Sequence, residues 1–174
     1  MEIGATKAVQ DRLKTTKIEE SKGASLAFCW DTHLTKIKGR NVLFIVNASN
    51  RYTIAMTDIE QGNWNYYTMY ISRVIHGVMQ EMGYSEDQIG QYFKMSGDTT
   101  VTKTHGRKSV GGINRMVMDA QYFGKKLEKE AKYQWELSEY LNRDICQPEG
   151  FDAYGYPSEL FKLDMERLGI AAKR

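Results

Sequence analysis

The spacing of hydrophobic and polar positions changes along the chain, and each change marks a boundary between predicted elements. Residues 25–57 contain short apolar runs separated by turn residues, a pattern that is typical of β-strands. The predicted strands cover residues 25–30, 33–38, 41–47 and 51–57. Their connections are too short for crossovers, so we expect hairpins and an antiparallel meander. A fifth strand over residues 99–104 is expected to return to this sheet.

Residues 63–82 have apolar side chains at steps of three and four, which predicts a helix. Further helices are predicted over residues 5–15, 85–95, 108–126, 129–145 and 157–168. The sequence therefore predicts an α+β fold, an antiparallel sheet of about five strands packed with helices. We expect a core domain over residues 1–125 and a C-terminal helical extension over residues 126–174.

Composition limits the classes of partner. The chain has 174 residues, of which 41% are hydrophobic and 11% aromatic, and this is enough for a packed core rather than disorder. A net charge of +2 argues against an acidic mimic of nucleic acid, and it is too low for a protein that coats nucleic acid nonspecifically. An electrostatic partner would have to be bound by a local patch.

The cysteines, Cys29 and Cys146, are far apart, and no Cys/His spacing resembles a zinc site. We therefore expect two free buried thiols, no metal and no cofactor. The sequence has neither an apolar signal core nor an apolar run of 18 residues. These features predict a cytoplasmic protein with no membrane partner.

The most informative segment is residues 99–114, TTVTKTHGRKSVGGIN, which is predicted to form a strand, a tight basic turn and a helix start. Such a junction can hold an anion through free backbone N–H groups and the positive end of the helix. The alternative is an ordinary helix N-terminus with solvated cations. The glycine spacing excludes a phosphate loop. The candidate binding residues are Lys103, Thr104, His105, Arg107, Lys108, Ser109 and Asn114.

A second polar group, Asn47, Asn50 and Arg51, lies between two predicted strands. It is either a plain hairpin with Arg51 on its rim or a part of the same binding surface. The two groups would converge if strand 99–104 neighboured strand 41–47.

Catalytic chemistry has little support in the sequence. Asp31 and His33 could form a general base and its orienting partner, but no nucleophile accompanies them, and a structural histidine is the alternative. We assign no catalytic residue. The loop aromatics Phe151, Tyr154 and Tyr156 are instead predicted to anchor a protein partner.

Four short motifs occur in order along residues 1–125: TKxxxDxLK, FxWxxxL, VNxxxRY and TKTxxRS. The matching residues are Thr6, Lys7, Asp11, Leu13, Lys14, Phe28, Trp30, Leu34, Val46, Asn47, Arg51, Tyr52, Thr102, Lys103, Thr104, Arg107 and Ser109. In these motifs the chain resembles an uncharacterised prokaryotic and phage family, a domain of unknown function. The resemblance implies no activity, but it suggests a mobile-element setting, in which such small proteins often resemble anti-defence factors.

Together these features predict a small non-catalytic binding protein of a phage or mobile element that inhibits a host macromolecular machine. An anti-CRISPR inhibitor of an RNA-guided nuclease fits this description. Its partner would be a protein or ribonucleoprotein, with contact to a nucleic-acid backbone. The alternative is a nucleic-acid- or nucleotide-binding protein, or an enzyme that uses Lys103, Arg107 and Asn47 around a phosphate with Asp31 and His33.

Overall fold

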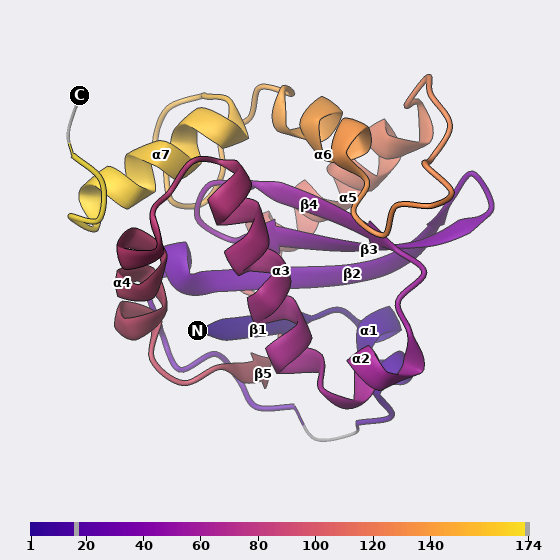
Figure 1. The fold of residues 1–174 in the computed structure, drawn as a ribbon, viewed down its shortest axis with the longest axis horizontal. Helices are drawn as coiled ribbons and strands as arrows, with labels where there is room; N and C mark the ends of the chain where they lie inside the picture. The colour runs from indigo at the N-terminus through magenta and orange to yellow at the C-terminus, as the bar shows by residue number, and fades with distance from the viewer. Residues whose placement is uncertain (16–17, 173–174) are drawn as a thin grey trace.

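The structure, a computed structural model, describes residues 1–15 and 18–172 and contains a mixed five-stranded sheet with the strand order β4-β3-β2-β1-β5. Figure 1 shows the strands and the helices around them. The strands are β1 (Glu2–Ala5), β2 (Cys29–Ile37), β3 (Arg40–Asn47), β4 (Thr53–Thr57) and β5 (Thr100–Thr102). The helices are α1 (Lys7–Leu13), α2 (Gln61–Asn65), α3 (Tyr67–Glu81), α4 (Glu86–Ser96), α5 (Gly106–Gln121), α6 (Trp135–Asn142) and α7 (Pro157–Arg167). The predicted α+β class is confirmed.

The prediction of a purely antiparallel sheet is wrong, because the N-terminal strand β1 is inserted between β2 and β5 and is parallel to both. Its four residues are too short a run to show a strand pattern in the sequence. As a result β5 lies at the edge beside β1, and strand 99–104 does not neighbour strand 41–47, which was the condition for the two polar groups to converge across the sheet. Gly4 of β1 lies opposite Asp31 of β2 and Thr102 of β5.

Strand β2 is one continuous strand where the sequence predicted two. Asp31 and Thr32, expected to form a turn, are fully buried and pair with Val46 and Ile45 of β3. Their polar atoms have partners within the fold, so the strand continues through them. The strand instead turns at Lys38 and Gly39, both of which have positive φ.

The sheet is covered by helices on both faces. In Figure 1, α3 crosses in front of the sheet and α5 lies behind it. Helices α3, α4 and α7 pack in one apolar cluster with Ile3, Trp30, Leu43 and Ile45. Helices α5 and α6 pack in a second cluster with Val42, Phe44 and Val46. The chain therefore forms three layers, and the continuously apolar strand β3 contributes side chains to both cores.

The outer edge of β4 is covered by residues 131–134 and α6. Backbone bonds join Thr57 N–H to the Lys132 carbonyl (2.7 Å) and Gln134 N–H to the Ala55 carbonyl (2.9 Å). The predicted helix over residues 129–145 therefore begins only at Trp135. Further along the edge, the Asn142 side chain accepts from Thr53 N–H and donates to its carbonyl, both at 2.8 Å. This covering satisfies an edge that would otherwise expose unpaired backbone groups.

The residues after position 125 contribute to both apolar clusters. Leu137 and Leu141 of α6 belong to the cluster behind the sheet. Phe161 and Met165 of α7 belong to the cluster in front of it. Within residues 1–15 and 18–172, none of the helices has the length and apolar character needed to cross a bilayer.

Candidate functional site: a basic cleft beside a buried polar cluster

The connection between β5 and α5 is held in place by the carboxylate of Asp31. This side chain comes from β2 and is fully buried. It accepts the backbone N–H of His105 at 3.2 Å through each oxygen, and it also accepts the hydroxyl proton of Ser109. His105 is the residue that immediately precedes α5. The Asp31 side chain, which comes from β2, therefore caps the N-terminus of this helix. The negative charge also lies at the positive end of the helix, where it is favoured.

The imidazole of His105 lies between two buried carboxylates. Its Nδ1 is 2.7 Å from Asp31 Oδ1, and its Nε2 is 3.0 Å from Glu2 Oε2. Burial alone would lower the pKa of His105, but the hydrogen bonds and charges of Asp31 and Cys29 outweigh it and raise the pKa to about 10. At neutral pH this side chain is therefore a buried imidazolium, held between the carboxylates of Asp31 and Glu2.

Glu2 is fixed from its other side as well. Its Oε1 accepts the backbone N–H of Lys22 at 2.8 Å. Burial would raise the pKa of Glu2, but its hydrogen bonds to Ser21, Lys22 and His105 outweigh burial and lower it. The carboxylate is therefore the stable form of Glu2, and it pairs with the imidazolium of His105, which Asp31 also contacts.

The cluster contains serine, histidine and aspartate but does not have the geometry of a nucleophilic triad. The Ser109 hydroxyl donates to Asp31, whereas the ring nitrogens of His105 face Asp31 and Glu2. A triad requires the histidine to accept the proton of the nucleophile. The arrangement positions a helix; it does not activate a serine.

A surface cleft lies beside the first turns of α5, and Ser109 of the cluster is among its lining residues. It has a volume of about 350 Å³ and is formed by the 47–52 turn, α5 and the loop around residue 148. Its cations are Arg51, Lys108 and Arg115, and the acid among its described lining residues is Glu149. Lys108 and Glu149 are 3.9 Å apart. Arg115 Nε is 3.2 Å from Asp119 Oδ1, so the lining holds more cations than acids, but two of the cations have an acidic neighbour.

Arg51 links the 47–52 turn to α5. Its backbone has a φ of 62°, and its Nη2 donates to the Gly112 carbonyl at 3.1 Å. A Cβ atom on Gly112 would lie 3.2 Å from Nε of Arg51, so the glycine permits this close approach. Arg51 of the second polar group thus meets Lys108 and Ser109 of the first group around one cleft, through α5 and not through neighbouring strands.

The structure places the other predicted binding residues in different environments. Asn47 and Asn50 are fully buried: Asn47 donates to the Ala27 carbonyl (3.0 Å), and Asn50 donates to Asp164 (2.8 Å). Lys103 pairs with Glu20, and Thr104 is half-buried beside the cluster. Arg107 and Asn114 are exposed on α5.

The predicted aromatic anchors also differ from one another. Phe151 is buried, and the guanidinium of Arg167 lies 3.9 Å from its ring centroid. Tyr154 and Tyr156 are exposed to 70% and 44%. Of the three predicted anchors, Tyr154 and Tyr156 therefore have exposed surface that a partner could contact.

The fold does not bring together the residues of the alternative enzyme, which would bind a phosphate with Asn47 and Lys103 and use Asp31 and His33. Asp31 faces His105, whereas His33 Nδ1 lies 3.2 Å from Thr6 Oγ1, and burial lowers the pKa of His33. Asn47 is used within the turn. These side chains do not form a common site with Lys103.

Glu2 and Cys29 were not predicted as site residues from the sequence, and the partner considered for Asp31 was His33, whereas the structure shows His105. Glu2 belongs to the strand that was not predicted, and Cys29 begins β2 beside it. Both lie next to His105, which is far away in the sequence. In the sequence, Glu2 and Cys29 are only an isolated acid and an isolated cysteine, and this pattern is too weak to predict a cluster.

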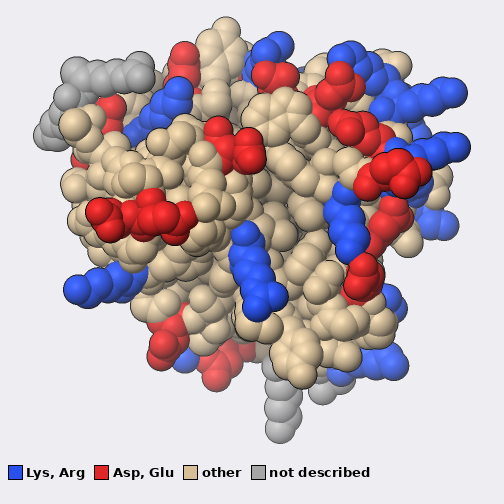
Figure 2. All heavy atoms as spheres, in the orientation of Figure 1, with Lys and Arg blue, Asp and Glu red and all other residues tan. Residues whose placement is uncertain are grey.

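Figure 2 shows one face of the molecule, on which Lys and Arg lie among Asp and Glu without a stripe of one sign. The fold and the site together define an α+β protein with a basic cleft beside a buried polar cluster. Residues 2–160 match the family described as "Domain of unknown function (DUF6933)", and the chain belongs to that family. The match extends past residue 125, through α6 and into α7. No curated protein and no solved structure matches the chain.

Proposed function

We propose that this protein is a small, non-catalytic, cytoplasmic binding protein that inhibits a macromolecular partner by holding one of its acidic groups in the basic cleft. The observation that carries the proposal is the lining of the cleft, which holds the cations Arg51, Lys108 and Arg115 and, among its described residues, the acid Glu149. Arg115 also pairs with Asp119 at 3.2 Å, so an acidic group of a partner would compete with that contact. The site is preorganised, because Arg51 and the start of α5 are already held by hydrogen bonds within the protein.

The size of the cleft favours an acidic protein surface over a long nucleic acid. A volume of about 350 Å³ is at the small end of the range for ligand pockets and can admit a side chain or a single nucleotide unit, but not a row of phosphates. A nucleic-acid groove would need cations along a stripe, and the net charge of the chain is only +2. The exposed rings of Tyr154 and Tyr156 supply the apolar contacts that protein interfaces use.

The finer form of the proposal concerns the partner. The sequence motifs suggest a phage or mobile-element setting, and an RNA-guided nuclease of the host is the partner expected there. The direct test adds the purified protein to a panel of CRISPR effector nucleases and measures both complex formation and DNA cleavage. We expect inhibition of at least one effector. Lack of binding and of inhibition across the panel would reject an anti-CRISPR role.

Charge reversal separates the cleft from the rest of the basic segment. In the variant Lys108→Glu/Arg115→Glu, two exposed cations of the cleft are replaced, and we expect the affinity for the inhibited effector to fall at least about tenfold. The matched control is Lys103→Glu/Arg107→Glu, because it changes the net charge equally and both cations are exposed but do not line the cleft. Equal loss in both variants would point to diffuse electrostatic attraction.

The nucleic-acid alternative has its own signature. Fluorescence anisotropy with labelled single-stranded RNA and duplex DNA should detect little binding if the cleft accepts a protein side chain. Tight binding that weakens steeply with salt would instead indicate several phosphate contacts and would favour the alternative.

A further inference from the structure

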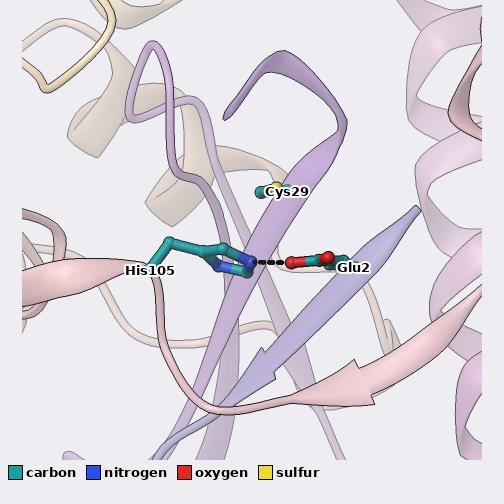
Figure 3. Close-up of side chains that lie close together, drawn as sticks. All are labelled: Glu2, Cys29 and His105. Carbon is teal, nitrogen blue, oxygen red and sulfur yellow. Dashed lines mark hydrogen bonds and ion pairs between the residues drawn. The ribbon is translucent and has the colours of Figure 1, made fainter. Parts of the chain in front are cut away.

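The buried cluster contains a donor set that its role as a helix cap does not use. A carboxylate oxygen of Glu2, the Sγ of Cys29 and a ring nitrogen of His105 all lie within 4.8 Å of one another. Figure 3 shows these three side chains, with the ring of His105 pointing at Glu2 and Cys29 beside them. The three residues are 5%, 0% and 8% exposed. Thiolate, imidazole and carboxylate together are typical ligands of zinc.

We propose that Glu2, Cys29 and His105 bind a divalent thiophilic transition metal, with zinc as the first candidate. The ligands come from the start of β1, the start of β2 and the β5–α5 connection. They are so far apart in the sequence that no metal-binding spacing is visible, and this is why sequence analysis predicted no metal.

The environment of His105 supports this assignment. Its Nδ1 is hydrogen-bonded to Asp31 at 2.7 Å, and its Nε2 is the nitrogen that faces Glu2. A carboxylate that fixes the far nitrogen of a histidine is the usual outer partner of a metal ligand. Glu2 is likewise held by the Lys22 N–H, which orients one oxygen toward His105. The outer contacts that a metal site needs are therefore already present.

The distances are compatible with a four-coordinate ion. With bonds of about 2.0–2.3 Å, ligand atoms around zinc lie about 3.3–3.8 Å apart. The Nε2···Oε2 separation is 3.0 Å, and the widest separation allowed by the cluster is 4.8 Å. Closing the cluster around an ion requires side-chain shifts of about 1 Å. A water molecule would complete the coordination.

Metal binding is coupled to the protonation of the ligands. The ligands hold a divalent ion as a carboxylate, a thiolate and a neutral imidazole nitrogen, so any protons that Cys29 and His105 carry pass to solvent as the metal enters. The ion would then join β1, β2 and the start of α5 directly. Binding of metal would thereby stabilise the helix end that forms one wall of the basic cleft.

The test uses the full chain and Co²⁺ as a spectroscopic probe, followed by competition with Zn²⁺. We expect a thiolate-to-cobalt charge-transfer band that is lost in Cys29→Ser and kept in Cys146→Ser. The second variant is the matched control, because Cys146 is also buried and free but lies in a different cluster. A spectrum without this band, or a band that survives in Cys29→Ser, would overturn the proposal.

A second measurement needs no variant and so does not depend on the folding of Cys29→Ser. Zinc should slow the alkylation of Cys29 in the unaltered chain at least about tenfold, as measured by mass spectrometry of peptides, and should leave Cys146 unchanged. Equal protection of both cysteines would indicate general stabilisation, and no protection would indicate that zinc does not bind here. Either result contradicts the proposal.

Discussion

Gly4 is the residue that allows the buried carboxylate of Asp31 to lie against β1. A Cβ atom at this position would overlap Asp31 Oδ1 and would approach the Cα of Thr104 to 3.0 Å. Since Asp31 caps α5 and pairs with His105, its displacement would leave buried polar groups without partners. We predict that Gly4→Ala lowers the free energy of unfolding by about 2–3 kcal/mol.

Chemical denaturation followed by circular dichroism measures this change. The control is Gly90→Ala, because Gly90 is exposed in α4 and a Cβ atom there meets nothing within 4 Å. That variant should be neutral or more stable by up to about 1 kcal/mol. Unchanged stability of Gly4→Ala would mean that Asp31 can shift without lowering the free energy of unfolding. The capping of α5 by Asp31 would then not contribute to stability.

Asp164 gives a prediction for pH. Burial raises the pKa of Asp164, although the hydrogen bonds from Asn50 and Ser49 and the nearby Arg167 lower it in part. The folded chain then binds this proton more readily than the unfolded chain, so the contribution of Asp164 to stability increases as pH falls toward 3.8. Asp164→Asn removes the titration and keeps an acceptor for Asn50.

We therefore expect the wild type to gain stability relative to Asp164→Asn as pH falls, with a difference of no more than about 1 kcal/mol near neutral pH. Urea denaturation over a pH series measures the difference. The exposed Asp144 supplies the control, and Asp144→Asn should show no such trend. If the wild type loses stability relative to Asp164→Asn at low pH, the pKa of Asp164 is not raised in the folded chain.

At the scale of single residues, the sequence indicated some residues of the polar cluster but not the residues that they contact. It singled out His105 and Ser109, and both belong to the cluster. It could not find their partners, because Glu2 and Asp31 come from strands whose pairing depends on the whole sheet. Asn47 and Asn50 are the opposite case: their amide groups are consumed by buried hydrogen bonds that turn composition alone does not reveal.

Helix α6 replaces a sixth strand along the edge of β4. The Ser138 hydroxyl accepts the N–H of Ala55 at 3.0 Å, and one turn later Asn142 binds both backbone groups of Thr53. Asn142→Ala would leave a buried N–H and a buried carbonyl without partners. We predict a loss of about 3 kcal/mol in the free energy of unfolding and faster amide exchange at Thr53.

The matched control is Asn114→Ala, since Asn114 is exposed on α5 and its replacement should change stability by less than about 0.5 kcal/mol. Hydrogen exchange read by mass spectrometry or NMR distinguishes a local from a global effect. Unchanged protection of β4 in Asn142→Ala would show that the edge is covered by other contacts.

Elements with a strong internal period were predictable, and elements that depend on tertiary contacts were not. The helices α3, α4, α5 and α7 follow from their apolar spacing and from signals such as the capping box at Ser85. The strand β1 is too short to have a period, and β2 runs through Asp31 because buried partners satisfy it. Residues 131–134 read as helix but follow the edge of β4, a competition that local propensity does not resolve.

At the scale of the whole molecule, the buried polar cluster lies where β1, β2, β5 and α5 meet. Residues after 125 pack into the apolar clusters on both faces of the sheet. The cleft uses both regions, because Lys108 comes from α5 and Glu149 from the loop that follows α6. A binding surface assembled from such distant segments depends on the folding of the entire chain.

The division into residues 1–125 and 126–174 can be tested on this basis. Ending the chain after residue 125 removes Leu137, Phe161 and Met165, each of which is almost completely buried. Loss of each such side chain costs about 2–5 kcal/mol, so the three losses together are comparable with the total stability of about 5–15 kcal/mol expected for a domain, and the uncovered edge of β4 adds to them. We therefore predict that the shortened chain shows no cooperative thermal transition by circular dichroism and exposes apolar surface to a hydrophobic dye. A sharp transition close to that of the full chain would instead establish residues 1–125 as an independent domain, and the extension would then have to act on the partner rather than on the fold.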